Sequence, residues 1–328
     1  MASSKTKTLL IYKYLVDFSD ENNPLSTTDL INYLMKDGML CERKSIYADI
    51  AVLKDIGFDI VKTTSPKKGF FLGSRQFELP EVRLLIDAVT SAGFITPNKT
   101  QSLVEKLETL VSKNQAEELV SQVYVDSDTK CDNEEIYYVI DALNDAIIDK
   151  NKVSFKYKRR NIDKENKKSY TEKTFTVSPY ALIWKDDHYY LVCNNEKYDN
   201  LMNLRLDRMK KITCLDEKAR PIEEVSEYKG AFDVADYTSK MFNMFTGETS
   251  KVVITCDLSI REEIMDRFGA KIPLTAVDTD HFKTEINAAV SDGLVSWIMS
   301  FGNKIKVEEP KSLAKSVKEK AQSIAKLY

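Results

Sequence analysis

The stretch "VSPYALIWKDDHYYLVCNN", residues 177–195, decides how the second half of the chain folds. It predicts two short apolar strands around a polar turn at residues 185–187. The stretch "NLRLDRM", residues 203–209, follows closely and sets Arg205 and Arg208 among apolar neighbours. Charged side chains are rarely buried without partners, because desolvation is costly. These arginines therefore predict either a bound anion or an internal acidic partner, for which Asp207 is one candidate.

Short strands on both sides of this stretch predict a small antiparallel β-barrel over residues 150–220. Val153, Phe155 and Tyr157 alternate with polar residues, which is typical of a strand with one buried face. Residues 150–173 hold ten Lys or Arg against three Asp or Glu, the most basic patch of the chain. A solvated loop is the plain alternative, because runs of charge usually have that role.

The first 75 residues predict three helices followed by a two-stranded hairpin, which is the order of a winged helix-turn-helix. The third helix is expected over residues 42–56, and the hairpin "FDIVKTTSPKKGFFLGS" carries lysines at its tip. In that fold the third helix enters the major groove and the hairpin contacts phosphate. The predicted contacts are Arg43, Lys44, Ser45 and Tyr47 from the helix and Lys67 and Lys68 from the hairpin. The alternative is a protein-interaction module with a solvated charged face.

Residues 76–149 predict a helical linker, and two further regions follow the barrel. The linker carries apolar stripes at Leu85, Ile86 and Val89 and at Leu103, Leu107 and Leu110. Such stripes serve either core packing or a dimer bundle. Because a regulator that reads two half-sites needs a dimer, we expect a homodimer. Residues 221–248 are expected to form a connecting helical segment, and residues 249–328 an α/β extension. The predicted class is therefore α+β.

Two stretches resemble known families of bacterial regulators. "RKSIYADI", residues 43–50, resembles the recognition helix of winged regulators of the DeoR type, although Ala48 stands where an arginine is usual. Residues 177–209 resemble the WYL domain, an Sm-like barrel. The matching positions are Pro179 and Tyr180, then Tyr189, Tyr190 and Leu191, and finally Arg205, Leu206, Asp207, Arg208 and Met209. Tyr189 replaces the eponymous tryptophan. The last 80 residues resemble the WCX extension of the same regulators.

The resemblance implies a transcriptional regulator whose WYL barrel senses a nucleic-acid or nucleotide effector. Arginine forks suit phosphate and tyrosine rings stack on bases. The candidate effector site therefore comprises Arg205, Arg208, Tyr190, His188, Lys156 and Lys158. The expected partners are double-stranded DNA, a single-stranded nucleic acid or nucleotide, and a second copy of the chain. The alternative is a nucleic-acid-binding accessory protein that modulates a nuclease or defence system.

The composition of the chain excludes several classes of protein and of binding site. The chain has 328 residues and a net charge of -3, so a uniformly basic coat is excluded but local patches are not. Five scattered cysteines and two histidines predict reduced thiols and no metal site. No phosphate loop or nucleophile–base pair is evident, so we expect neither an enzyme nor a cofactor. No apolar run reaches the roughly 20 residues that span a bilayer, and we expect a cytoplasmic protein.

Overall fold

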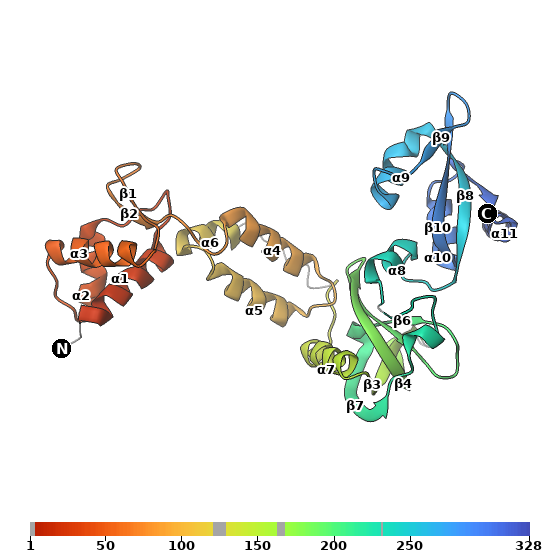
Figure 1. Ribbon diagram of the computed structural model, residues 1–328, viewed down its shortest axis with the longest axis horizontal. Helices are drawn as coiled ribbons and strands as arrows, with labels where there is room; N and C mark the ends of the chain where they lie inside the picture. Colours follow the sequence, from red (N-terminus) through yellow and green to blue (C-terminus); the bar gives the residue numbers. More distant parts are fainter. Residues whose placement is uncertain (1–3, 121–128, 163–167, 231) are drawn as a thin grey trace. The chain divides into compact units, whose positions relative to one another are not determined.

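The computed structural model describes residues 4–120, 129–162, 168–230 and 232–328 (Figure 1). For residues 4, 160–162, 168 and 169 it describes the backbone alone. The chain divides between Glu134 and Glu135 into two compact units. Helices and antiparallel sheets occur in both, which confirms the α+β class predicted from the sequence.

The first unit begins with three helices and a hairpin, in the order that the sequence predicts. They are α1 (Ser4–Phe18), α2 (Thr27–Lys36), α3 (Arg43–Asp55), β1 (Ile60–Thr63) and β2 (Gly69–Leu72). Ser26 caps α2, since its hydroxyl accepts from the Asp29 amide at 3.1 Å while the Asp29 carboxylate accepts from the Ser26 amide at 2.8 Å. The apolar faces meet in one core, formed by Ile11, Leu15, Leu30, Leu34, Ile46, Ile50 and Leu53.

The hairpin is fixed to the helices through its second strand. Leu25 and Phe70 exchange backbone hydrogen bonds of 2.8 Å in both directions. Gly69 makes this approach possible, because a Cβ there would lie 2.6 Å from the Leu25 carbonyl oxygen. The hairpin therefore has a defined position beside the start of α2.

Three further helices complete the first unit, α4 (Leu79–Ser91), α5 (Pro97–Glu108) and α6 (Lys113–Val120). Their core is formed by Val82, Ile86, Val104, Val111, Ala116 and Leu119, with Leu107 and Leu110 packed against it. Part of each stripe that predicted a dimer is thus used within the chain. Leu84 and Leu85 remain on the surface, 69% and 38% exposed.

Buried hydrogen bonds connect these helices to the first three. The Asp20 carboxylate, after α1, accepts from the Ser112 hydroxyl at 2.5 Å, and both residues are buried. Arg75 donates to the carbonyls of Val16 and Ser19 at 2.8 and 2.7 Å, where it satisfies the end of α1. Arg75 thereby connects the residues that follow the hairpin to the end of α1.

The second unit begins with α7 (Ile136–Ile148), which packs on a five-stranded sheet. The strands are β3 (Asn151–Ile162), β4 (Lys168–Lys185), β5 (His188–Asn194), β6 (Met202–Arg205) and β7 (Met209–Lys218), in the spatial order β6-β5-β4-β3-β7. The long strand β4 pairs with β3 up to Val177 and with β5 from Ser178 onward, and a bulge at residues 179–181 bends it.

The predicted closed barrel is not found. Closure would require β6 and β7 to pair, and within residues 151–162 and 168–218 the ladder connects neither strand to the other. The physical reason lies at the end of β6. This strand has four residues, and the 3-10 turn η1 (Leu206–Arg208) turns the chain away before β7 begins. The sheet is strongly bent but open.

A short connection follows, with η2 (Ile222–Glu224) and α8 (Val234–Lys240). The last region has the strands β8 (Glu248–Asp257), β9 (Leu274–Ala276), β10 (His281–Val290) and β11 (Ile305–Glu309), in the order β11-β8-β10-β9. The 3-10 turn η3 (Leu258–Ile260) and the helices α9 (Arg261–Phe268), α10 (Asp292–Ser300) and α11 (Lys311–Ala325) accompany them. The succession β-α-β-β-α-β with this strand order is the split βαβ arrangement of ferredoxin-like domains.

Candidate nucleic-acid and effector sites

The leading turn of α3 presents an aromatic ring between two cations. The guanidinium carbon of Arg43 lies 6.0 Å from the centroid of the Tyr47 ring, and Nζ of Lys62 on β1 lies 5.9 Å from it. A hydrogen bond from Arg43, together with one from Thr27, lowers the pKa of Tyr47. Arg43, Lys44 and Lys62 are all exposed. The sequence predicted Arg43, Lys44 and Tyr47, and the structure adds Lys62 to them.

Ser45, also predicted as a base contact, is half-buried and has a hydrogen-bond partner within the protein. Its hydroxyl accepts a hydrogen bond from the ammonium of Lys7 on α1. The same ammonium lies 2.8 Å from the Asp49 carboxylate, which also accepts from the Thr8 hydroxyl at 2.7 Å. Side chains of α1 and α3 are thereby joined across the helix–helix contact. Ser45 belongs to this internal network rather than to the exposed face.

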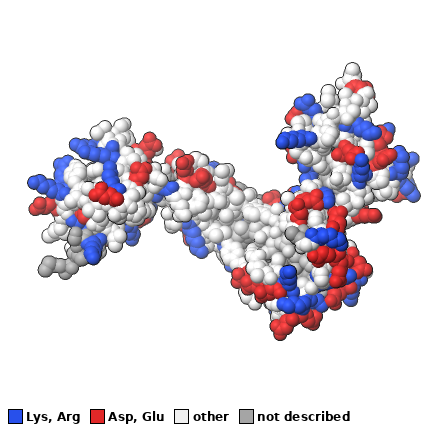
Figure 2. Space-filling view, in the orientation of Figure 1, with Lys and Arg blue, Asp and Glu red and all other residues white. Residues whose placement is uncertain are grey.

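The two hairpin lysines also differ from each other. Lys67 lies 3.7 Å from the Asp29 carboxylate, so part of its charge is offset. Lys68 is exposed and has no ion pair among the residues that the structure describes. Figure 2 shows Lys and Arg side chains gathered over the hairpin of the first unit. Lys68 is therefore the stronger candidate for a phosphate contact.

Arg205 answers the question raised by the sequence with an internal partner. Its guanidinium binds the Asp207 carboxylate in a fork, with Nε 3.0 Å from one oxygen and Nη2 2.6 Å from the other. Its Nη1 lies 2.6 Å from Nε2 of His188. The strand ends at Arg205, and Asp207 lies in η1, the turn that follows it directly. The Arg205 charge is therefore already neutralised.

His188 is held in its neutral form by this arrangement. Because arginine only donates, Nε2 of His188 accepts the hydrogen bond from Arg205. Burial, followed by the charge of Arg205, lowers the pKa of His188. The Tyr190 ring lies 6.2 Å from the His188 ring, edge to face, and Tyr190 pairs with Arg205 across strands β5 and β6. His188, Tyr190 and Arg205 thus do come together, as predicted, but around a carboxylate.

Arg208 is exposed and lies beside Tyr157, whereas Lys156 and Lys158 lie elsewhere. Burial raises the pKa of Tyr157 and the charge of Arg208 offsets part of this rise. Tyr157 faces the core and its hydroxyl accepts from the Arg205 amide at 3.3 Å. Strand alternation sends Lys156 and Lys158 to the opposite face of β3. There Lys156 lies 3.6 Å from Glu172, and Lys158 lies 3.6 Å from the Tyr170 ring centroid. The expected convergence of these lysines with Arg205 is wrong.

A basic cavity of about 520 Å³ lies instead between β4 and the turn after β5. Its lining includes four cations, Lys152, Arg159, Lys173 and Lys197, and one carboxylate, Glu196. Alternation along β3 could have placed Arg159 on the same face as Tyr157, opposite the face of Lys156. Lys197 and Tyr198 lie in a polar turn, and their contribution gave no signal in the sequence.

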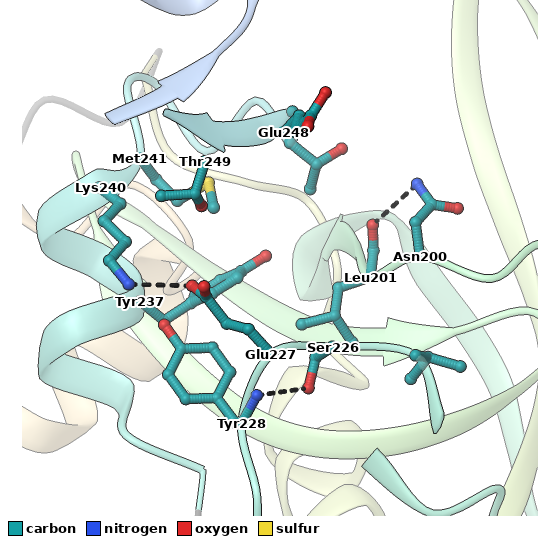
Figure 3. Close-up of a pocket in the computed structure, with 13 residues that line it drawn as sticks. Asn200, Leu201, Ser226, Glu227, Tyr228, Tyr237, Lys240, Met241, Glu248 and Thr249 are labelled. Carbon is teal, nitrogen blue, oxygen red and sulfur yellow. Dashed lines mark hydrogen bonds and ion pairs between the residues drawn. The ribbon is translucent and has the colours of Figure 1, made fainter. Parts of the chain in front are cut away.

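A second cavity, of about 470 Å³, lies beside α8 and the start of β8 (Figure 3). Its lysine, Lys240, points to the Glu227 carboxylate at 2.9 Å and lies 2.6 Å from Asp236. The Tyr228 hydroxyl donates to Asp236 at 2.7 Å. Because the only lining cation is bound twice by carboxylates, this cavity offers no free positive charge to an anion.

Two known domain families match stretches of the second unit. A WYL domain model matches residues 138–214, and a WCX domain model matches residues 248–325. The chain contains a WYL domain and a WCX domain. The WYL match spans α7 to β7 apart from the ends, and the WCX match spans the split βαβ region and α11. These two matches do not extend to the first helices, so the DeoR-type resemblance stays a prediction.

Among solved structures, the chain is similar to proteasome accessory factor B/C (PafBC) of Arthrobacter aurescens. The sequences are 14% identical, and the likeness covers 96% of this chain with a TM-score of 0.28. The chain spans 47% of the PafBC chain. None of the curated proteins matches this chain.

Residues 4–120, 129–162, 168–230 and 232–328 contain neither a candidate metal-binding cluster nor a helix that could cross a membrane. Over these ranges, His, Cys, Asp and Glu form no group of three or more that could hold a metal ion. Across the same ranges, every helix is too short or too polar to cross a bilayer.

Proposed function

We propose that the protein is a DNA-binding transcriptional regulator with a winged helix-turn-helix at its N-terminus. The observation that carries this proposal is the group of exposed cations Arg43, Lys44 and Lys62 around the half-buried Tyr47 ring, where the leading end of α3 meets the hairpin that also carries Lys68. A helix that presents donors and an aromatic ring beside a basic hairpin suits base edges and phosphate together. The WYL and WCX domains support a regulator of this kind.

The proposed regulator responds to a phosphate-bearing effector in its second unit and acts as a homodimer. An effector shifts DNA binding only by the difference in its affinity for two states of the protein. The surface leucines Leu84 and Leu85 support self-association, because the buried residues of the same helix already pack within the chain and leave these two side chains exposed.

Selection from a random duplex pool by the full chain tests the proposal. We expect an enriched sequence motif, and Arg43→Ala should change the relative affinities among sites. Lys68→Ala should weaken binding to all sequences and lower the slope of log affinity against log salt by about 1. Lys13→Ala is the matched control, since Lys13 is an exposed lysine of α1 outside the cluster.

The outcome also separates the alternative function. Tight duplex or single-strand binding without any enriched motif would favour an accessory protein that binds nucleic acid and modulates a nuclease. Binding that Lys13→Ala and Lys68→Ala weaken equally would reject the assigned surface.

A further inference from the structure

We propose that the basic cavity beside β4 is a binding site for a nucleotide-sized ligand that carries phosphate and an aromatic base. The inference rests on the proposed function in that the ligand would be the effector of the regulator. The cavity of about 520 Å³ has the size of ordinary small-molecule sites. It is distinct from the Arg205 cluster that the sequence favoured.

Among the described residues, three cations that line the cavity have no carboxylate partner. Glu196 and Glu217 both bind Lys152, at 2.5 and 3.1 Å. Asp199, in the same turn as Glu196, binds Arg220 at 2.9 Å. Glu196, Glu217 and Asp199 are therefore already paired with Lys152 or Arg220. Arg159, Lys173 and Lys197 line the cavity with no ion pair to any residue that the structure describes. Three unopposed cations around one hollow create a positive potential that attracts an anion.

The turn that forms one wall is held in place by buried contacts. Asn194, fully buried, donates through Nδ2 to the carbonyls of Tyr198 and Asn200 at 2.7 and 2.9 Å. The Lys152 pairs fix Glu196 from the other side. Lys197 and Tyr198 are consequently presented from a preorganised turn, which lowers the entropic cost of ligand binding.

The opposite wall adds backbone donors. The order β5-β4-β3 places β5 and β3 on opposite edges of β4. Residues 173–177 of β4 pair with β3, whereas β5 pairs with β4 only from Ser178 onward. On the edge toward β5, residues 173–177 have no ladder partner among the described strands. Alternate N–H groups along this edge are available to phosphate oxygens, which backbone amides commonly bind.

The Tyr198 ring offers a stacking surface for an aromatic base of the ligand. Its side chain lines the cavity and remains 61% exposed. An exposed ring beside free cations is the combination that binds a base by stacking and its phosphate by charge. A nucleotide, free or at the end of a strand, satisfies both features, whereas inorganic phosphate satisfies one.

Calorimetry with the full chain tests the site with four probes, ADP, adenosine, pyrophosphate and a five-residue oligothymidylate. We expect ADP to bind, and adenosine to bind at least about 10-fold more weakly because it lacks charge-assisted hydrogen bonds. Lys173→Ala with Lys197→Ala should weaken ADP and pyrophosphate binding by about 10-fold or more. Tyr198→Leu should weaken ADP binding and leave pyrophosphate binding unchanged. Binding of the oligonucleotide but not of ADP would place the ligand at the end of a strand.

The matched control is Lys156→Ala, which removes a charge from the other face of the same hairpin. Equal losses in Lys156→Ala and in the double variant would mean that only the overall charge matters, and the site would be rejected. Failure of the wild type to bind any probe at millimolar concentration would also overturn it. Duplex binding is measured in parallel on every variant. If it stays intact while all probes fail, the regulator stands without this site. If duplex binding is absent while ADP binds as expected, the cavity stands and the proposed function falls.

Discussion

Replacing Lys7 by methionine should loosen α3 selectively, although Lys7 was not expected to matter for DNA binding. The Lys7 ammonium binds the Asp49 carboxylate at 2.8 Å and donates to Ser45, and the two charged side chains are 17% and 9% exposed. Methionine keeps the length of the side chain and removes the charge. Asp49 would then keep a single hydrogen bond, from Thr8 at 2.7 Å.

The cost follows from the burial of the carboxylate. Removing one partner of a buried ion pair destabilises a protein by about 3–5 kcal/mol, because the other charge is left uncompensated. Since Lys7 keeps some exposure, we expect the lower end, about 3 kcal/mol. That corresponds to about 100-fold faster amide exchange by opening of α3.

Hydrogen exchange read by mass spectrometry on peptides covering residues 43–55 measures this opening directly in the full chain. Lys5→Met is the control, because Lys5 is exposed on the same helix. The double variant Lys7→Met with Asp49→Asn should recover part of the loss, since no bare carboxylate remains. The reasoning is refuted if Lys7→Met and Lys5→Met exchange at the same rate over these peptides.

Other predictions concern the second unit and the assembly. Arg205→Ala should lower the free energy of unfolding by about 2 kcal/mol in urea titrations, because Asp207 loses a charged fork, and Asp207→Ala in the same chain should restore part of it. In the folded chain, burial and then the charge of Arg205 lower the pKa of His188. The unfolded chain therefore binds a proton at His188 more readily than the folded chain does. Stability should therefore fall as the pH drops through 6.5, the ordinary value, and His188→Asn should flatten this dependence in urea midpoints. Light scattering should give the mass of two chains, and Leu84→Ser should shift it toward one.

The sequence predicted most elements because their signals are local. Apolar periodicity locates α3 and the helices of residues 79–148. The sequence predicted a barrel where the structure has an open sheet, because the end of a strand is not visible in a local pattern. The end of β6 depends on how Arg205, Asp207 and His188 bind one another, and that network forms only in the fold.

The surroundings of the candidate site residues could be predicted only in part, since a sequence shows charges but not their partners. Ser45 matched the pattern of a base contact, yet Lys7 from another helix reaches it. Lys156 and Arg159 looked equivalent in a run of positive charge. Lys156 lies beside Glu172, whereas Arg159 lines the cavity.

Pairing divides the cations of this chain into two groups with different consequences. Lys7, Lys152 and Arg205 are largely shielded and bound by carboxylates, so they fix geometry and respond weakly to salt. Lys68 and Lys173 have no carboxylate partner among the residues that the structure describes, so they are available to polyanions and their interactions weaken as salt screens them. A chain with a net charge of -3 can thus keep positive surfaces locally, because carboxylates beside them, such as Asp29 and Glu196, are already paired with lysines. Raising the salt concentration should accordingly release both duplex DNA and the phosphate ligand at concentrations that leave the fold intact.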